Sequence, residues 1–207
     1  MRGLTLHAHE IRRLLSAGDV LVLRPVKPQP HKRNFAGEEV YVWNRYWFDK
    51  IIPTDMLEDC PLGAPGEQRF VRETWGVSAK LPVSAHGDEL IWLAYPDMRG
   101  YKADNLPGNW RWRSPVTMPR WASRATVTVR DVRVLRVQDV TMDVAMMAIA
   151  VQAGYSGTQV IQRDGTPSDG MLPDEEFEAD YTARYPGTPW AWAVTVQLTP
   201  ATPAQEE

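Results

Sequence analysis

The sequence is poor in the residues that build covalent or metal-bound sites. Its 207 residues include one cysteine, Cys60, so no disulfide can form within the chain. Of the four histidines only His7 and His9 lie close together, and nothing supplies the remaining ligands of a zinc site. We therefore expect no metal, no cofactor and a reducing, cytoplasmic environment. Cys60 lies in a turn with no histidine beside it, so we expect a structural role for it.

Long apolar runs are also missing. No stretch approaches the roughly 18 apolar residues of a transmembrane helix, so we expect no membrane association. The N-terminal segment lacks the apolar core of a signal peptide, which argues against secretion. Hydrophobic residues nevertheless make up 43% of the chain, enough to build a packed core. We expect a single domain over residues 1–198 and a disordered tail over residues 199–207.

A general excess of basic residues is absent too, since the net charge is −3. Sequence-independent DNA binders are usually basic overall, because their affinity comes from counterion release at phosphates. The charge is uneven, with eight Lys/Arg against four Asp/Glu in residues 101–150 and two against nine in residues 151–207. Local basic patches could guide a short RNA or a nucleotide, or they could be solvated faces beside an acidic C-terminal segment.

Hydrophobic periodicity predicts an α+β fold. Helices are expected over residues 9–17, ended by Gly18, over residues 142–151, capped by Thr141, and over residues 173–185, beginning at Pro173. Ile11, Leu14 and Leu15 should share the buried face of the first helix. Long loops are expected over residues 76–89, 97–115 and 154–173. The predicted strands are DVLVLR (19–24), EVYVWNRYWF (39–48), RFVRETW (69–75), ELIWLAY (89–95), ATVTVRDVRVLRV (125–137, with a bulge or turn near Asp131) and PWAWAVTVQL (189–198).

Nine tryptophans are many for this length, and two of them fall in a segment expected to be a loop. Trp75, Trp190 and Trp192 lie in predicted strands and should be core residues. The WRWR stretch over residues 110–113 is different, because Trp110 and Arg111 can each pack on an unpaired base. Such stacking contributes roughly 1–3 kcal/mol per base.

Several charged residues are further site candidates, each with a structural alternative. Arg24 and Lys27 could hold a phosphate, the arginine through its bidentate fork, or they could be exposed charges beside a proline-rich exit. Glu73, which follows Arg72, could face a cleft and bind a base edge, or it could pair with an arginine. The residue types alone leave these alternatives open.

Seven segments occur in the order typical of one family. They are VKPQP (26–30), CPLGAPGE (60–67), FVRETW (70–75), YKAD (101–104), MPRWASR (118–124), RDVRVLRVQDV (130–140) and PWAWAV (189–194). Together they span about 170 residues, and in this set the chain resembles the ASCH-domain proteins of tailed phages and prophages.

The resemblance implies a PUA-like mixed β-barrel with flanking helices and long loop insertions, and a cleft that receives RNA or a nucleoside. MPRWASR, in which Arg120 and Arg124 bracket Trp121, would form a wall of that cleft. The ligand-binding residues that we predict are Arg24, Lys27, Arg72, Glu73, Trp110, Arg111, Arg120, Trp121 and Arg124.

Catalytic members of the family are amidohydrolases that remove the acetyl group of N4-acetylcytidine. They use a lysine and a threonine of a GxKxxTxR motif and a glutamate on a later helix. In this chain the lysine position falls on Asp19, the threonine position on Val22 and the glutamate position at about Ala148. Gly18 and Arg24 of the motif remain. We therefore predict no catalytic residues of the family type.

Three functions stay open. The first is a non-catalytic module that binds RNA, a modified nucleoside or a nucleotide. The second is a protein-interaction factor of phage origin that acts on a host partner, for which the acidic segment over residues 164–180 is the main argument. The third is an amidohydrolase of N4-acetylcytidine-like substrates with a rebuilt site. The sequence favours them in this order.

Overall fold

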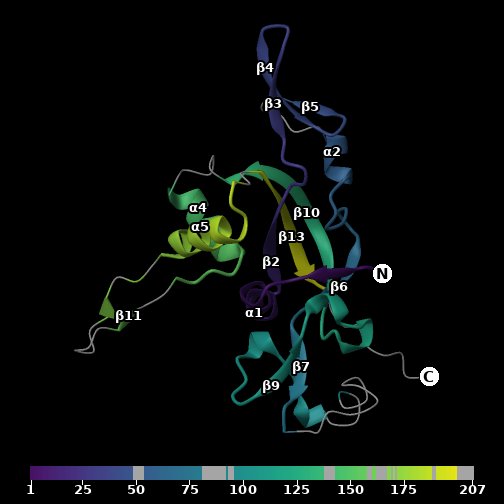
Figure 1. The fold of residues 1–207 in the computed structure, drawn as a ribbon, viewed down its shortest axis with the longest axis vertical. Helices are drawn as coiled ribbons and strands as arrows, with labels where there is room; N and C mark the ends of the chain where they lie inside the picture. Colours follow the sequence, from purple (N-terminus) through teal and green to yellow (C-terminus); the bar gives the residue numbers. More distant parts are fainter. Residues whose placement is uncertain are drawn as a thin grey trace.

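The computed structural model describes residues 1–48, 54–80, 92, 96–137, 143–157, 160–161, 167–168, 170, 172–187 and 190–199. Its centre is a mixed five-stranded sheet in the order β1-β6-β10-β13-β2 (Figure 1). β1 runs parallel to β6, and the other neighbours are antiparallel. These strands are β1 (Gly3–Thr5), β2 (Asp19–Pro25), β6 (Gln68–Arg72), β10 (Thr126–Arg136) and β13 (Trp190–Leu198).

Helices cover the sheet, and the described residues form three smaller sheets besides it, in the orders β3-β4-β5, β8-β7-β9 and β11-β12. The helices are α1 (Ala8–Ala17), α2 (Thr54–Glu58), α4 (Asp143–Gln152) and α5 (Pro173–Arg184), with short 3-10 turns η1 (Pro96–Met98), η2 (Lys102–Asp104), η3 (Pro115–Thr117) and η4 (Arg120–Ala122). The remaining strands are β3 (His31–Phe35), β4 (Glu38–Trp43), β5 (Tyr46–Phe48), β7 (Trp75–Ser78), β8 (Arg99–Tyr101), β9 (Trp110–Arg113), β11 (Val160–Ile161) and β12 (Pro167–Ser168). In Figure 1 the β3-β4 hairpin extends from one end of the molecule and β7-β9 from the other.

The fold is therefore α+β, as the periodicity predicts. Within the described ranges, the strand pairings leave β1 and β2 as the edges of the main sheet and do not close it into a barrel.

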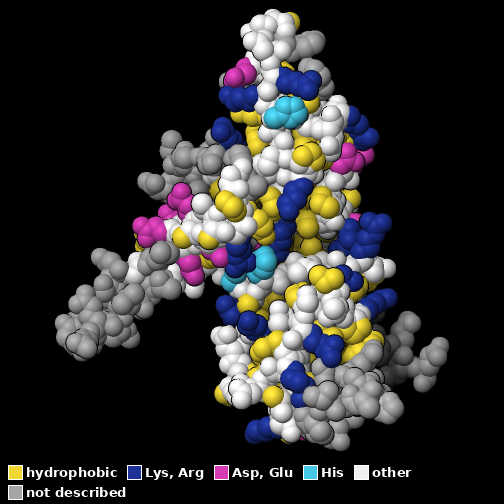
Figure 2. All heavy atoms as spheres, viewed as in Figure 1, with side chains coloured by type: hydrophobic (Ala, Val, Ile, Leu, Met, Phe, Trp, Pro, Cys, Tyr) yellow, Lys and Arg dark blue, Asp and Glu magenta, His cyan; other side chains and the backbone are white. Residues whose placement is uncertain are grey.

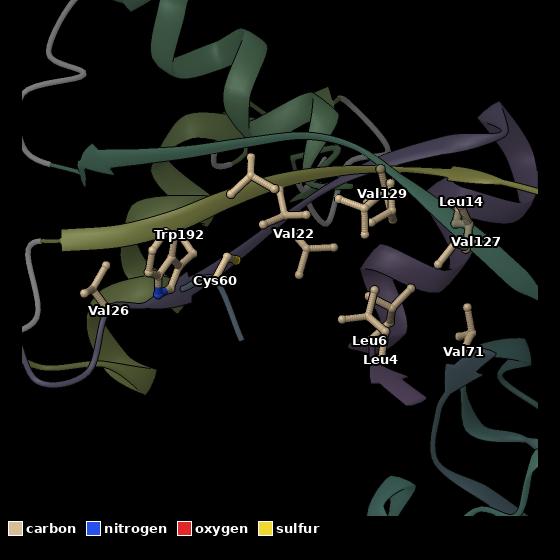
Figure 3. Close-up of a cluster of buried hydrophobic side chains, with 14 of the residues drawn as sticks. Leu4, Leu6, Leu14, Val22, Val26, Cys60, Val71, Val127, Val129 and Trp192 are labelled. Atoms are coloured by element: carbon tan, nitrogen blue, oxygen red, sulfur yellow. The ribbon is translucent and has the colours of Figure 1, made fainter. Parts of the chain in front are cut away.

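The two faces of the central sheet support separate cores because side chains alternate along each strand. On one face Val22, Val129 and Val194 pack against α1 and β1, and Figure 3 shows Val22, Val129, Leu14 and Trp192 within this cluster. On the other face the main-sheet residues pack beneath α4 and α5. The buried members of this second core are Leu21, Leu23, Val137, Ala150, Ala153, Phe177, Tyr181, Ala191 and Ala193.

Most predicted elements with strong local signals are confirmed. Gly18 ends α1 with φ 82°, and its N–H donates to the carbonyl oxygen of Leu14 at 2.9 Å. The register of β10 against β13 shifts between Val129 and Asp131, which confirms the bulge. α4 covers the predicted second helix, although its proposed cap Thr141 lies outside the described residues. Pro173 begins α5, as its fixed φ favours.

Several expectations were wrong in detail. EVYVWNRYWF forms two strands, β4 and β5, because the chain turns at Asn44 with φ 51°. RFVRETW breaks after Arg72, since β6 joins the main sheet and β7 joins the small β8-β7-β9 sheet. That small sheet also gives regular structure to residues 76–78 and to parts of the predicted loop 97–115, including WRWR. Leu15 is 44% exposed rather than core.

Other expectations cannot be compared with the structure. The predicted strand ELIWLAY lies outside the described residues apart from Trp92, and so do residues 200–207 of the predicted tail. Cys60 is buried in the main core, and burial raises the pKa of its thiol. This placement agrees with the structural role expected for it.

Candidate functional site

Arg24 lies near the end of β2, and its side chain turns toward the start of α1. Its two terminal nitrogens donate to both carboxylate oxygens of Glu10, at 2.7 and 2.8 Å. The same nitrogens also donate to the carbonyl oxygens of Leu23 and Thr5, at 2.8 and 2.9 Å. The bidentate fork is thus occupied by protein groups, and a phosphate at Arg24 would have to compete with Glu10 for it.

Glu10 is the partner that the sequence analysis missed. It is 2% exposed and lies in the first turn of α1, where its Oε2 also accepts the backbone N–H of His7 at 2.6 Å. Burial alone would raise the pKa of Glu10, but the charge and the hydrogen bonds of Arg24 outweigh burial and hold this pKa below its ordinary value. The pair therefore stays ionised at neutral pH.

A small hollow, with a cavity volume of about 20 Å³ and one side open to solvent, lies beside this ion pair. We call it the α1-α5 hollow, because α1 and α5 line it together with Leu23, Arg24 and the segment that follows α4. The Tyr155 hydroxyl donates to the carboxylate of Asp180, and Arg184 Nε donates to Asp180 Oδ1 at 2.7 Å. Burial is the main cause that raises the pKa of Tyr155, and the hydrogen bond to Asp180 raises it further. The Tyr155 hydroxyl therefore stays protonated and can donate.

Aromatic rings give the hollow flat apolar walls. The rings of His9 and Tyr155 lie 4.4 Å apart between centroids, and Tyr155 meets Phe177 edge-on at 5.6 Å. Tyr181 and Tyr185 complete this side. In Figure 2 acidic side chains gather over the side of the molecule where α5 lies in Figure 1, and a His patch lies near the centre. A flat polar ring could thus find both stacking surfaces and hydrogen-bonding groups here.

His7 supplies a test of this arrangement, because burial lowers its pKa from 6.5 to about 4. Below pH 6.5 the unfolded chain binds a proton at His7 that the folded chain does not, so this residue makes stability fall as the pH drops toward 4. We expect His7→Gln to reduce that fall by about 1–2 kcal/mol, discounted for partial exposure. Urea unfolding between pH 7.5 and 4.5 measures the difference, with the exposed His31→Gln as a control. Parallel pH profiles for His7→Gln and the wild type would contradict it.

A second ionic cluster lies outside the hollow and joins two predicted site residues. Arg124 Nε and one terminal nitrogen donate to the two Glu73 oxygens at 2.8 and 3.0 Å, and Arg124 also pairs with Asp104 at 2.8 Å. The guanidinium lies 4.2 Å from the ring centroid of Tyr101. Glu73 is 2% exposed, and burial raises its pKa despite Arg124. Of the two interpretations of Glu73, the structure shows the ion pair.

The other predicted site residues are dispersed. Lys27 is exposed beyond β2, and the side chain of Arg72 lies against Gly3 and over the ring of Phe70 at 5.1 Å. Arg120 and Trp121 form η4, where the 44% exposed Trp121 meets Trp75 edge-on at 6.4 Å.

Trp110 and Arg111 lie in β9. Of the nine predicted residues, only Arg24 lines the α1-α5 hollow, so MPRWASR does not form a wall of this hollow.

The positions that correspond to the family's catalytic groups do not meet in the structure. Val22 has no exposed surface and lies in the main core, whereas Asp19 is exposed and pairs with Arg13 at 3.4 Å. Ala148 is exposed on α4. None of these three residues lines the hollow.

The sequence carries a weak signal for Glu10 and no signal for the contact between Tyr155 and Asp180. A glutamate three residues after His7, at the start of a helix, is the spacing by which a side chain caps a helix, and it could have drawn attention to Glu10. Tyr155 and Asp180 are 25 residues apart, and no local pattern predicts their contact.

Among the described residues no group of three or more His, Cys, Asp or Glu side chains could hold a metal ion. In the same part of the chain, no helix has the length and apolarity needed to cross a bilayer. Comparisons with family models, with curated proteins and with solved structures give no match. The resemblance to ASCH-domain proteins therefore stays a prediction from the sequence motifs.

Proposed function

We propose that this chain is an ASCH-type, PUA-like binding module that holds a nucleoside, a nucleotide or the end of a short RNA at the open side of the α1-α5 hollow, with only an edge of the base entering it. The observation that carries the proposal is the meeting of aromatic rings with a fixed set of polar groups beside Arg24, the arginine that remains from the family motif. Arg24 acts as a positioning residue, because Glu10 and two carbonyl oxygens hold its terminal nitrogens.

The chemistry of the hollow suits a nucleobase. Bases are recognised by stacking on aromatic faces and by hydrogen bonds to their edges. Tyr155 and His9 offer rings, Asp180 offers a carboxylate acceptor, and Arg184 offers guanidinium donors. Asp180 is already hydrogen-bonded to Tyr155 and Arg184, so the ligand would meet groups with fixed orientations.

The proposal does not include the family's amidohydrolase reaction. That reaction needs a hydroxyl nucleophile next to a proton acceptor. The corresponding position, Val22, carries no hydroxyl and lies in the core, and Asp19 lies on the surface at the start of the same strand. These placements support binding without acetyl removal.

Isothermal titration with cytidine, CMP, UMP and N4-acetylcytidine tests this function. We expect micromolar binding of at least one ligand, and at least a tenfold weaker Kd for Asp180→Asn, because a hydrogen bond to a charged group contributes about 1.5–3 kcal/mol. The matched control is Asp131→Asn, whose carboxylate pairs with Arg133 on β10 and does not line the hollow. The control should change Kd less than about twofold.

Mass analysis of N4-acetylcytidine after incubation with the protein separates binding from catalysis. Unchanged N4-acetylcytidine together with binding supports the proposal. Loss of the acetyl group would overturn the non-catalytic part and favour a rebuilt amidohydrolase site. Absence of binding across the panel would overturn the proposal as a whole.

One observation favours a protein partner as the second candidate function. α5 carries three acidic residues in its first turn, Asp174, Glu175 and Glu176, and Glu178 is exposed on the same helix. An acidic helix surface attracts basic partners. A phage-derived factor that acts on a host protein would use this side of the molecule, and pull-down with α5 charge variants would test it.

A further inference from the structure

The small β8-β7-β9 sheet carries an aromatic surface that the proposed function does not use. Opposite residues in antiparallel strands project to the same face. Gly76 on the central strand pairs with Gly100 on one side and Trp112 on the other, while Ser78 pairs with Trp110. One face of this sheet therefore contains two glycines and two tryptophans.

The glycines allow the indole rings to lie close against the sheet. A Cβ atom at Gly76 would lie 2.9 Å from Trp112 Cε3, and one at Gly100 would lie 2.9 Å from Trp110 Cζ3. Larger residues at these two positions would lift the rings, so glycine here serves close packing. The rings of Trp110 and Trp112 lie 5.5 Å apart with 22° between their planes.

The indole pair is held before any ligand arrives. Trp110 Nε1 donates to the carbonyl oxygen of Pro107 at 3.0 Å, which fixes the rotation of its ring. Both tryptophans are half-buried, with the glycine side covered by the sheet. Since the rings are already ordered, stacking a planar group on them costs little side-chain entropy. We call this pair the indole platform.

The charge around the platform indicates which planar groups fit. Within residues 75–80 and 96–123 there are six basic side chains, Lys80, Arg99, Lys102, Arg111, Arg113 and Arg120, against two acidic ones, Asp97 and Asp104. Three of the six, Arg99, Arg111 and Arg113, alternate with the platform residues along their strands and so project from the opposite face of this thin sheet. Figure 2 shows Lys and Arg side chains spread over this end of the molecule. The excess of basic side chains attracts the negative charges of a phosphate backbone, whereas it does not attract a neutral carbohydrate.

We propose that the indole platform binds single-stranded nucleic acid, with unpaired bases stacked on Trp110 and Trp112 and the phosphates in the basic field of the β8-β7-β9 unit. Single-strand binders combine these two elements, aromatic side chains on which bases stack and basic residues that follow the backbone. This site is separate from the α1-α5 hollow and does not depend on it.

Fluorescence anisotropy with labelled oligouridylate and oligothymidylate 12-mers tests the platform. Two double variants keep the glycines covered by apolar side chains, Trp110→Phe/Trp112→Phe with rings and Trp110→Leu/Trp112→Leu without them. We expect the leucine variant to lose at least roughly tenfold in affinity for both oligomers. The phenylalanine variant should keep most of it, and affinity should fall as salt rises because bound phosphates release counterions.

The controls separate this site from the hollow. The leucine variant should leave mononucleotide titration at the hollow unchanged, and Asp131→Asn, a residue of neither site, should leave 12-mer affinity unchanged. Equal 12-mer affinity for the leucine variant and the wild type, at equal thermal stability, would overturn the proposal. Salt-independent binding, or binding of a neutral hexasaccharide in place of the 12-mers, would overturn it as well. If the leucine variant does not fold, the phenylalanine variant is titrated with the single-stranded 12-mer and with a duplex of the same length. Equal affinity for the two would decide against the platform, because the bases of a duplex are not free to stack on the indole rings.

Discussion

Replacing Glu10 with leucine is expected to cost about 3–5 kcal/mol of unfolding free energy, because the substitution leaves a buried guanidinium without its carboxylate. Arg24 keeps only the carbonyl oxygens of Leu23 and Thr5 as acceptors. Arginine cannot release its proton at any pH at which the protein folds, so no change of pH relieves the buried charge. Urea unfolding at pH 7 measures the loss.

The double variant Glu10→Leu/Arg24→Leu is the control for this effect. Replacing both partners of a buried ion pair with apolar groups is often neutral or stabilising. We therefore expect the double variant to recover at least half of the lost free energy. If the single variant cost less than about 1 kcal/mol of unfolding free energy, the Glu10–Arg24 pair would behave as an exposed ion pair and not as the buried pair described beside the hollow.

Arg124→Leu is expected to destabilise the fold by about 3 kcal/mol at pH 7, because Glu73 is buried and loses its main cationic partner. The expected cost is at the lower end of the range because the Arg124 side chain is 24% exposed. Its pH dependence distinguishes it from Glu10→Leu. The folded pKa of Glu73 already lies above 4.5, and removing Arg124 raises it further.

The sign of this dependence follows from proton binding. With a raised folded pKa, the folded chain binds a proton at Glu73 before the unfolded chain does, so stability rises as the pH falls toward 4.5. Arg124→Leu should therefore recover relative to the wild type between pH 7 and 5, whereas Glu10→Leu should not. Arg133→Leu, which removes an exposed pair with Asp131, should cost less than about 1 kcal/mol at every pH. An Arg124→Leu profile parallel to the wild type would contradict the buried state of Glu73.

These two ion pairs explain why charged candidates were hard to interpret from sequence. Arg24 meets a partner 14 residues away and Arg124 a partner 51 residues away. Whether an arginine binds a ligand or a buried carboxylate depends on which carboxylate the fold brings to it. Two arginines predicted to bind a ligand thus direct most of their hydrogen bonds to the protein itself.

Local signals predicted much of the architecture. Gly18 adopts the left-handed conformation that ends α1, Pro173 opens α5, and the phase shift near Asp131 marks the bulge in β10. In the predicted strand over residues 125–137 valines alternate with polar residues, and Val127 and Val129 are fully buried. Each of these features depends on the conformation of a few consecutive residues, which the sequence states directly.

By itself, then, the sequence determined the main helices, the core strands, the α+β class and the absence of a threonine or serine nucleophile between Gly18 and Lys27. The tertiary structure alone decided the break at Glu73, where the chain passes from one sheet to another, and the placement of Trp110 and Trp112 over Gly100 and Gly76. It also decided that Glu10 occupies the fork of Arg24. Helix caps and strand alternation act within a few residues, whereas strand partners and buried ion pairs depend on long-range packing of the whole chain.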